Sequence, residues 1–193
     1  DSQGNFKFKL PYGSYTVKQH TTTENFEKVK DFTIEVRETG PEVKKTIANA
    51  EITAKLKVVK IDAETKEVIK RSGIKFKIFN IDTNEYVCQN ITYPTSQKIC
   101  VFETDMNGEF ITPYELASGH YRLEEVDQVI DGYLWNTESH PFEIGENMEV
   151  ITDSEYGIIF ETLFSNSRVE GELTIHKNGE KVVIANGKIT FVK

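Results

Sequence analysis

Hydrophobic and polar residues alternate along most of the chain, and this period of two is typical of β-strands with one buried face. Turn dipeptides such as Asn107-Gly108 and Asn178-Gly179 separate the alternating segments. Strands at intervals of about ten residues, joined by short turns, predict an all-β protein built as a β-sandwich. The clearest alternating segments are residues 6–10, 15–17, 32–36, 56–58, 74–78, 121–123 and 173–175.

The chain also repeats itself, which is typical of an array of similar modules. The matching pairs are residues 1–6 (DSQGNF) with 105–110 (DMNGEF), residues 13–19 (GSYTVKQ) with 119–125 (GHYRLEE), and residues 56–60 (LKVVK) with 173–177 (LTIHK). These repeats predict three parts. Residues 1–50 are the C-terminal half of a preceding module, residues 51–168 are a complete module, and residues 169–193 are the first strands of a following one.

Three polar residues stand where the alternation calls for apolar ones. Residues of equal parity share one face of a strand. Lys60 continues an apolar stripe through residues 54, 56 and 58, Glu125 continues one through 121 and 123, and Asn166 ends one through 158, 160 and 164. Burying any of these groups alone costs several kcal/mol. One interpretation is therefore a partly buried Lys60–Glu125 ion pair, or side chains that reach solvent at strand ends.

A second interpretation is chemical. Burial disfavours the charged form of a lysine, and the neutral amine is a nucleophile. A buried carboxylic acid tends to keep its proton and can donate it to a carboxamide oxygen, then move protons as ammonia leaves. The product of such a reaction is a Lys60–Asn166 amide that forms once and is not turned over.

Several ordered motifs resemble one known family. They are residues 59–62 (VKID), 73–76 (GIKF), 104–108 (TDMNG), 116–125 (LASGHYRLEE), 131–133 (DGY) and 164–166 (FSN). In this order and spacing the sequence resembles the B-type (SpaA/prealbumin-like, Cna B-type) modules of Gram-positive cell-wall-anchored adhesins and pilins. The resemblance spans the whole of residues 51–168.

The resemblance implies an Ig-like sandwich of transthyretin-like topology. It also implies a spontaneous isopeptide bond between the first and last strands, with Lys60 as the amine, Asn166 as the acceptor and Glu125 as the catalyst. It places the protein outside the cell, attached to the cell wall through an anchor beyond this segment. Its partners would be neighbouring modules of the same protein, and it would be no enzyme beyond this single self-cross-linking event.

The flanking parts depart from the pattern. Gln19 occupies the position that matches Glu125, and an amide does not shuttle protons as a carboxylic acid does. Asn49 is the candidate acceptor of the first part. Lys177 is the candidate amine of the last part.

Composition excludes several other functions. The net charge is −8, and no dense run of Lys or Arg offers a nucleic-acid-binding surface. The apolar stretches are too short to cross a bilayer, so we expect no membrane insertion. Four scattered His residues have no metal-ligand spacing, so we expect no metal and no cofactor.

Cys88 and Cys100 are the chain's two cysteines and bracket eleven residues. In an extracellular protein a disulfide closing this excursion is one interpretation, and two half-buried free thiols are the other.

These observations favour a structural stalk module of a surface adhesin or pilus-like protein. A ligand-binding adhesin head that engages host matrix protein or glycan is the alternative, and a large insertion or a contiguous aromatic patch would favour it. A small hydrolase of transthyretin-like topology is a third interpretation, which the scattered His residues do not support.

Overall fold

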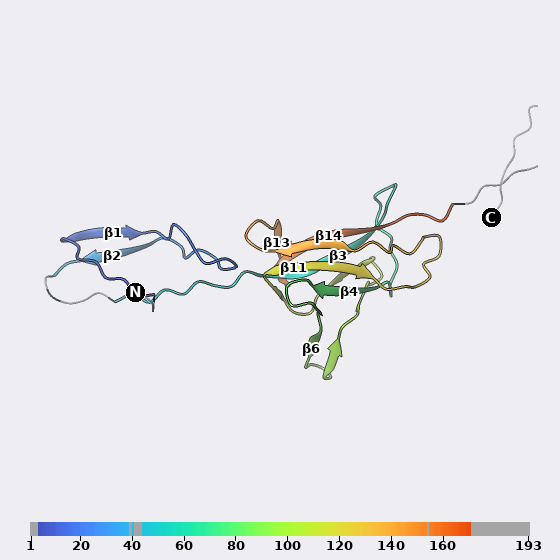
Figure 1. The fold of residues 1–193 in the computed structure, drawn as a ribbon, viewed down its shortest axis with the longest axis horizontal. Helices are drawn as coiled ribbons and strands as arrows, with labels where there is room; N and C mark the ends of the chain where they lie inside the picture. Colours follow the sequence, from blue (N-terminus) through green and yellow to red (C-terminus); the bar gives the residue numbers. More distant parts are fainter. Residues whose placement is uncertain (1–3, 39, 41–43, 154, 171–193) are drawn as a thin grey trace, which may run out of the picture.

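The computed structural model describes residues 4–38, 40, 44–153 and 155–170. Within these ranges the regular elements are all strands, which confirms the all-β prediction. The molecule is elongated, with a two-stranded unit at one end of its long axis and a larger sandwich next to it (Figure 1).

The sandwich consists of two facing sheets. The first has the order β10-β3-β14-β13, with β9 also paired to β3, and the second has the order β12-β11-β4-β5, with β8 also paired to β4. The strands of the first sheet are β3 (Thr53–Asp62), β9 (Glu109–Ile111), β10 (Leu116–Ala117), β13 (Val150–Asp153) and β14 (Gly157–Asn166). Those of the second are β4 (Lys75–Asn80), β5 (Glu85–Tyr86), β8 (Phe102–Glu103), β11 (Gly119–Glu125) and β12 (His140–Ile144).

The core lies between these two sheets. Along β11 and the first half of β3 the inward residues alternate with outward ones, as the period-two pattern requires, whereas every residue from Val58 to Asp62 of β3 is buried. Fully buried members come from both sheets, including Leu56 and Val58 on β3 and Phe76, Ile78 and Leu123 on the other sheet. These residues belong to one continuous apolar cluster.

The first and last strands of the sandwich are neighbours and run parallel. In the β3–β14 ladder Phe164 lies opposite Lys60 and Asn166 lies opposite Asp62. Because the two strands run in the same direction, their C-terminal ends meet at the same edge of the sheet.

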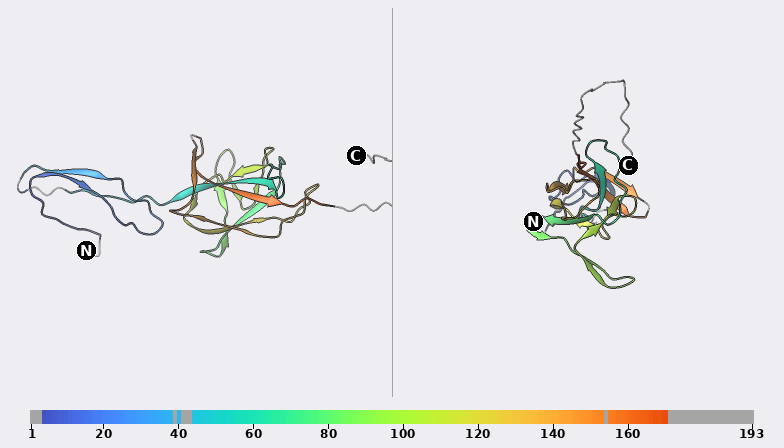
Figure 2. Two further views of the ribbon diagram at one scale, coloured as in Figure 1. Left: turned by 90° about the horizontal axis from the view of Figure 1, so that it is seen from above. Right: turned by 90° about the vertical axis from the view of Figure 1, so that its right-hand side faces the viewer.

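A small hairpin projects from the sandwich. It consists of β6 (Gln89–Ile91) and β7 (Gln97–Ile99), which pair only with each other among the described strands. Figures 1 and 2 both show it standing away from the two sheets. The Cys88–Cys100 disulfide closes its base, and Tyr93 near its tip is 85% exposed.

The N-terminal unit is a two-stranded antiparallel sheet of β1 (Gly13–Val17) and β2 (Phe32–Val36). The prediction of a strand at residues 6–10 is wrong, since these residues belong to no strand and Phe6 and Phe8 are 69% and 70% exposed. An alternating segment needs a neighbouring strand to complete its hydrogen bonds. The matching segment of the sandwich contains β9, which pairs with β3, and no described strand takes that place beside residues 6–10.

Candidate functional site

Three elements bring Lys60, Glu125 and Asn166 together. Lys60 lies near the end of β3, Asn166 is the last residue of β14, and Glu125 is the last residue of β11 in the opposite sheet. The parallel ladder aligns the first two, and the packing of the sheets adds the third. Lys60 and Asn166 are 0% and 1% exposed, and the Glu125 side chain is also fully buried.

The three side chains form a closed set of contacts. The Lys60 ammonium nitrogen Nζ lies 3.3 Å from Glu125 Oε2 and is also in direct contact with the Asn166 carboxamide oxygen Oδ1. The Asn166 amide nitrogen Nδ2 donates to Glu125 Oε2 at 3.0 Å. One carboxylate oxygen of Glu125 therefore touches both nitrogen atoms of the site.

Aromatic rings surround the amine. Lys60 Nζ lies 4.3 Å from the ring centroid of Phe164 and 5.3 Å from that of Phe76. Burial in this environment lowers the pKa of Lys60 from 10.5 to about 8, although the negative charge and hydrogen bond of Glu125 act in the opposite direction. At neutral pH about a tenth of such a lysine is the neutral amine.

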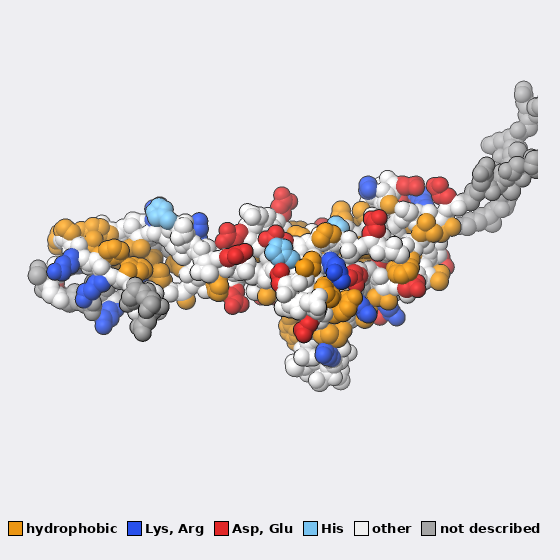
Figure 3. Space-filling view, in the orientation of Figure 1, with side chains coloured by type: hydrophobic (Ala, Val, Ile, Leu, Met, Phe, Trp, Pro, Cys, Tyr) orange, Lys and Arg blue, Asp and Glu red, His pale blue; other side chains and the backbone are white. Residues whose placement is uncertain are grey.

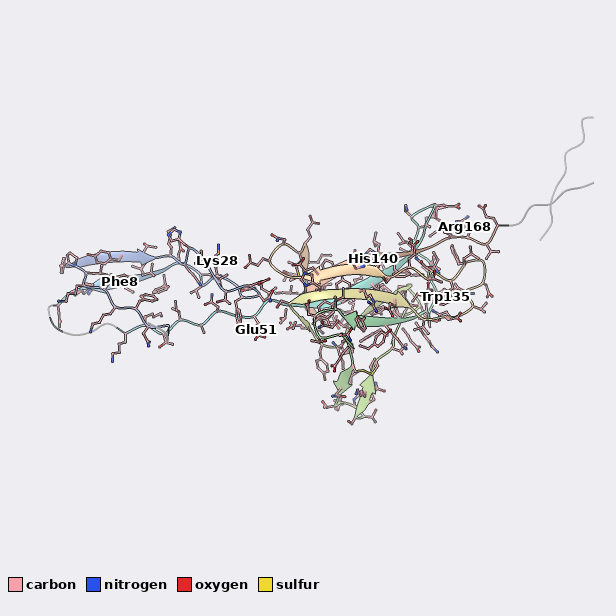
Figure 4. The ribbon with its side chains drawn as sticks, in the orientation of Figure 1. Phe8, Lys28, Glu51, Trp135, His140 and Arg168 are labelled. Atoms are coloured by element: carbon pink, nitrogen blue, oxygen red, sulfur yellow. A yellow bond between two sulfur atoms is a disulfide. The ribbon has the colours of Figure 1, made fainter. Side chains whose placement is uncertain are left out.

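A loop after β11 holds the acid and the carboxamide in place. The Leu134 backbone carbonyl accepts a hydrogen bond from Asn166 Nδ2 at 2.8 Å. The Asn136 backbone N–H donates to Glu125 Oε2 at 3.1 Å, and the Trp135 indole N–H donates to the Glu125 carbonyl at 3.1 Å. We call residues 134–136 the clamp. Figure 4 shows Trp135 at the end of the sandwich that lies away from the N-terminal unit.

The sequence does not predict the clamp. Its contacts with the Asn166 and Glu125 side chains are made by the backbone atoms of Leu134 and Asn136, which leave no side-chain signature. The one signal in the sequence is the chain's single Trp, placed three residues after Gly132.

A second polar contact joins the same strand ends. Asp62 Oδ2 accepts from Arg168 Nε at 2.5 Å and from the Tyr133 hydroxyl at 3.1 Å. Its other oxygen accepts from the backbone N–H groups of Glu64 and Thr65, both at 2.9 Å. The backbone hydrogen bond from Thr65 and the Arg168 guanidinium hold the pKa of Asp62 well below its usual range.

The flanking candidates are in part brought together. Asn49 Nδ2 donates to Gln19 Oε1 at 2.9 Å, so these two predicted residues are neighbours in the N-terminal unit. Lys177 lies outside the described residues. Cys88 and Cys100 are joined as a disulfide, away from the Lys60 site at the base of the projecting hairpin.

Neither a metal centre nor a membrane span is visible in the part of the chain that the structure describes. No group of three or more His, Cys, Asp or Glu side chains there could hold a metal ion. No helix there has the length and apolarity needed to cross a membrane.

Comparison with protein families decides what kind of module this is. A family model described as the SpaA prealbumin-like fold domain matches residues 54–156, more than half of the chain. The chain belongs to the SpaA family. This confirms the predicted resemblance, and the matched residues of the SpaA domain include Lys60 and Glu125. No curated protein sequence matches the chain significantly.

Several solved structures are similar to this chain. The Bacillus anthracis TIE protein is 22% identical with a TM-score of 0.51, over 83% of this chain and 26% of its own length. At this identity the likeness shows a common fold and nothing more. The minor pilin GBS52 of Streptococcus agalactiae is 18% identical (TM-score 0.45, covering 88% and 66%). The C-terminal domain of the shaft pilin SpaA from Lactobacillus rhamnosus GG is 21% identical (TM-score 0.35, covering 61% and 98%). The chain thus spans about a quarter of the TIE protein and about two thirds of the minor pilin.

Proposed function

We propose that residues 51–168 form a structural stalk module of a Gram-positive surface adhesin or pilus-like protein, closed by an autocatalytic amide bond between Lys60 and Asn166. The observation that carries this proposal is the position of Glu125. One of its carboxylate oxygens touches both the nitrogen that would attack and the nitrogen that would leave.

The reaction balances within these three side chains. The lone pair of neutral Lys60 Nζ attacks the carboxamide carbon of Asn166, and a new C–N bond forms. The bond from that carbon to Nδ2 then breaks, and Nδ2 leaves as ammonia with one proton that came from Nζ. Glu125 carries that proton, because it lies within hydrogen-bond reach of both atoms.

The surroundings favour attack in two ways. Burial makes the neutral amine accessible near physiological pH. The clamp carbonyl of Leu134 fixes Nδ2, so the carboxamide oxygen faces Lys60. The sequence predicts proton donation from Glu125 to the carboxamide oxygen, whereas the carboxylate contacts the two nitrogens, which favours the proton-transfer role.

The bond is tested by the intact mass of the folded chain. We expect a mass lower than the sequence mass by one ammonia, and a tryptic peptide that joins the Lys60 and Asn166 segments. Glu125→Ala should keep the ammonia. Glu124→Ala is the matched control, because Glu124 is the adjacent residue of β11 on the outward face, where it binds Arg122, and it should lose the ammonia normally. A wild-type mass equal to the sequence mass would refute the bond and leave Lys60 and Glu125 as a buried ion pair.

The stalk role accounts for the rest of the molecule. The family match places the module among SpaA prealbumin-like domains, and the sequence of the N-terminal unit repeats part of it. We infer an extracellular, cell-wall-attached protein whose anchor lies beyond this segment. Its first partners would be neighbouring modules.

One observation favours the alternative of a ligand-binding head. The disulfide-closed hairpin β6–β7 projects from the sandwich with Tyr93 exposed, as a contact arm for host protein or glycan would. Deletion of residues 90–98 distinguishes the two roles, because it removes the projecting hairpin and keeps the disulfide and the hydrogen bonds between Gln89 and Tyr114. Loss of adhesion to host protein or glycan with an unchanged melting temperature would support the role of a ligand-binding head. Unchanged adhesion would support the role of a stalk module.

A further inference from the structure

Asn136 makes three hydrogen bonds that lead in three directions. Its backbone N–H donates to Glu125 Oε2 at 3.1 Å. Its side-chain Nδ2 donates to the backbone carbonyl of Ser165 at 2.9 Å, and its Oδ1 accepts from the backbone N–H of Glu138 at 2.9 Å. One loop residue therefore contacts the acid, the strand that carries the acceptor, and its own loop.

The contact with Ser165 lies at the end of β14. Ser165 directly precedes the acceptor Asn166, which is the last residue of that strand. The ends of secondary-structure elements open more easily than their middles. A carboxamide at such an end keeps a fixed geometry only if neighbouring groups hold the backbone around it.

Backbone hydrogen bonds hold the next two positions. The Asn166 carbonyl accepts from the Ala63 N–H at 2.9 Å, and the Ser167 carbonyl accepts from the Leu134 N–H at 2.9 Å. The carbonyls of three consecutive residues are thus held, and the first of the three is held by the side chain of Asn136. This is the contact that a substitution can remove selectively.

Through this contact, residue 136 fixes the acid relative to the carboxamide. The Asn136 N–H holds the Glu125 oxygen that contacts both nitrogens of the site. The Asn136 side chain holds the strand one residue before the carboxamide. The distance of 3.0 Å between Glu125 Oε2 and Asn166 Nδ2 therefore depends on both contacts. A displacement of about 1 Å in such a site can slow a reaction about a hundredfold.

We propose that Asn136 is a positioning residue of the cross-linking reaction, which ties the Glu125 carboxylate to the end of β14 so that acid and acceptor keep one geometry. It acts through Glu125 and through the strand, and it carries no proton itself. This inference rests on the proposed function, because it concerns a step of the same reaction.

Asn136→Asp separates this role from a role in the local turn. Asp has the same shape as Asn, and its carboxylate can still accept from the Glu138 N–H, so the turn is kept. A carboxylate has no N–H to donate, so the contact with the Ser165 carbonyl is lost. We expect Asn136→Asp to lose ammonia about tenfold to a hundredfold more slowly than the wild type.

The pH profile of the rate distinguishes lost position from added charge. A negative charge near Lys60 would favour the protonated amine, so it would move the midpoint of the profile above the lowered Lys60 pKa of about 8. Lost position would instead lower the rate on the plateau at high pH. Asn136→Ala adds no charge, and we expect it to lower the plateau and leave the midpoint in place.

Asn80→Asp is the matched control. Asn80 Oδ1 accepts from the backbone N–H groups of Asp82 and Thr83 at 2.9 and 3.0 Å, so its side chain also holds a turn. Asn80 lies opposite Tyr121 in the β4–β11 ladder, four residues before Glu125 along β11. Acidic and basic side chains are mixed over the face of the sandwich that Figure 3 shows. One more carboxylate at position 80 should therefore leave the rate of ammonia loss unchanged.

Intact mass after refolding from inclusion bodies gives the rate, and fluorescence reports the clamp. Trp135 is the chain's single Trp, and its indole N–H donates to the Glu125 carbonyl. We expect its emission to reach the folded value in the wild type and in both Asn136 variants before ammonia is lost. If neither variant reached that value, Asn136 would act in folding and the positioning role would be overturned.

The inference and the proposed function fail separately. If Asn136→Asp and Asn136→Ala lose ammonia at the wild-type rate, the positioning role is refuted and the Lys60–Asn166 bond stands. A shifted midpoint with an unchanged plateau in Asn136→Asp would refute it as well. A wild type that keeps its ammonia would refute the bond, and the positioning role with it.

Discussion

Replacing Lys60 with Met should cost the sandwich most of what its covalent closure contributes. Met is apolar and close to Lys in length, so it fits between the rings of Phe76 and Phe164. It leaves the buried Glu125 without its cationic partner, which adds a cost of its own. Glu125 and Asn166 keep their hydrogen bonds to each other and to the clamp. The change therefore removes the amine and the partner of Glu125, and the intact mass of each sample separates the loss of the covalent bond from the loss of the ion pair.

The size of the effect follows from the positions of the joined residues. A Lys60–Asn166 bond closes a loop of roughly a hundred residues, and by analogy with a disulfide this contributes about 4.7 kcal/mol. For a module of this size each kcal/mol shifts the melting temperature by about 4 °C. We expect Lys60→Met to melt about 20 °C below the wild type.

Differential scanning calorimetry and intact-mass measurement on the same samples form the assay. Lys57→Met is the matched control, since Lys57 lies on the same strand but faces outward to Glu109 and Glu161 at 3.0 and 3.1 Å. Loss of these partly exposed ion pairs costs about 1 kcal/mol or less, and the ammonia should still leave. If Lys60→Met and Lys57→Met melt within a few degrees of each other, the covalent closure does not stabilise the module.

Three further outcomes are expected. When the chain is refolded from inclusion bodies, it should lose ammonia about tenfold faster at pH 7 than at pH 6, and the rate should level off above about pH 8. The reason is that the pKa of Lys60 is lowered to about 8, and equal rates would contradict it. Cys88 and Cys100 should resist alkylation until reduced, and labelling without reductant would show free thiols. Asp62→Asn should lower the free energy of unfolding in denaturant titrations at pH 7 but not in strong acid. The Asp62 carboxylate has a lowered pKa in the folded state, so its stabilising effect is present above the ordinary pKa of Asp and is lost as the pH falls through the folded-state pKa. An equal loss of stability at both pH values would contradict this.

Sequence alone predicts the parts of this module that depend on side chains. Alternation indicates the strands, and the interrupted apolar stripes single out Lys60, Glu125 and Asn166, whose roles the family resemblance then implies. Their parity on each strand also predicts that these three side chains enter one core, where the structure places them.

Sequence does not predict the parts that depend on backbone groups or on a missing neighbour. The Leu134 carbonyl accepts from Asn166 and the Glu27 carbonyl accepts from Asn49, and no pattern of residue types links these two positions. The segment 6–10 has the alternation of a strand, yet it forms none, because alternation reports which face is apolar and not whether a partner strand is present.

The parallel pairing of β3 and β14 also determines how the module would respond to pulling. The chain enters at the start of β3 and leaves at the end of β14, at opposite ends of the sandwich (Figure 1). A stretching force would therefore act along the strands and load their hydrogen bonds in shear, all at once. With Lys60 joined to Asn166, the force would pass from the first eight residues of β3 directly into the chain beyond β14. About 350 Å of contour length would then stay folded under tension, and the disulfide-closed hairpin within it would experience none of the load.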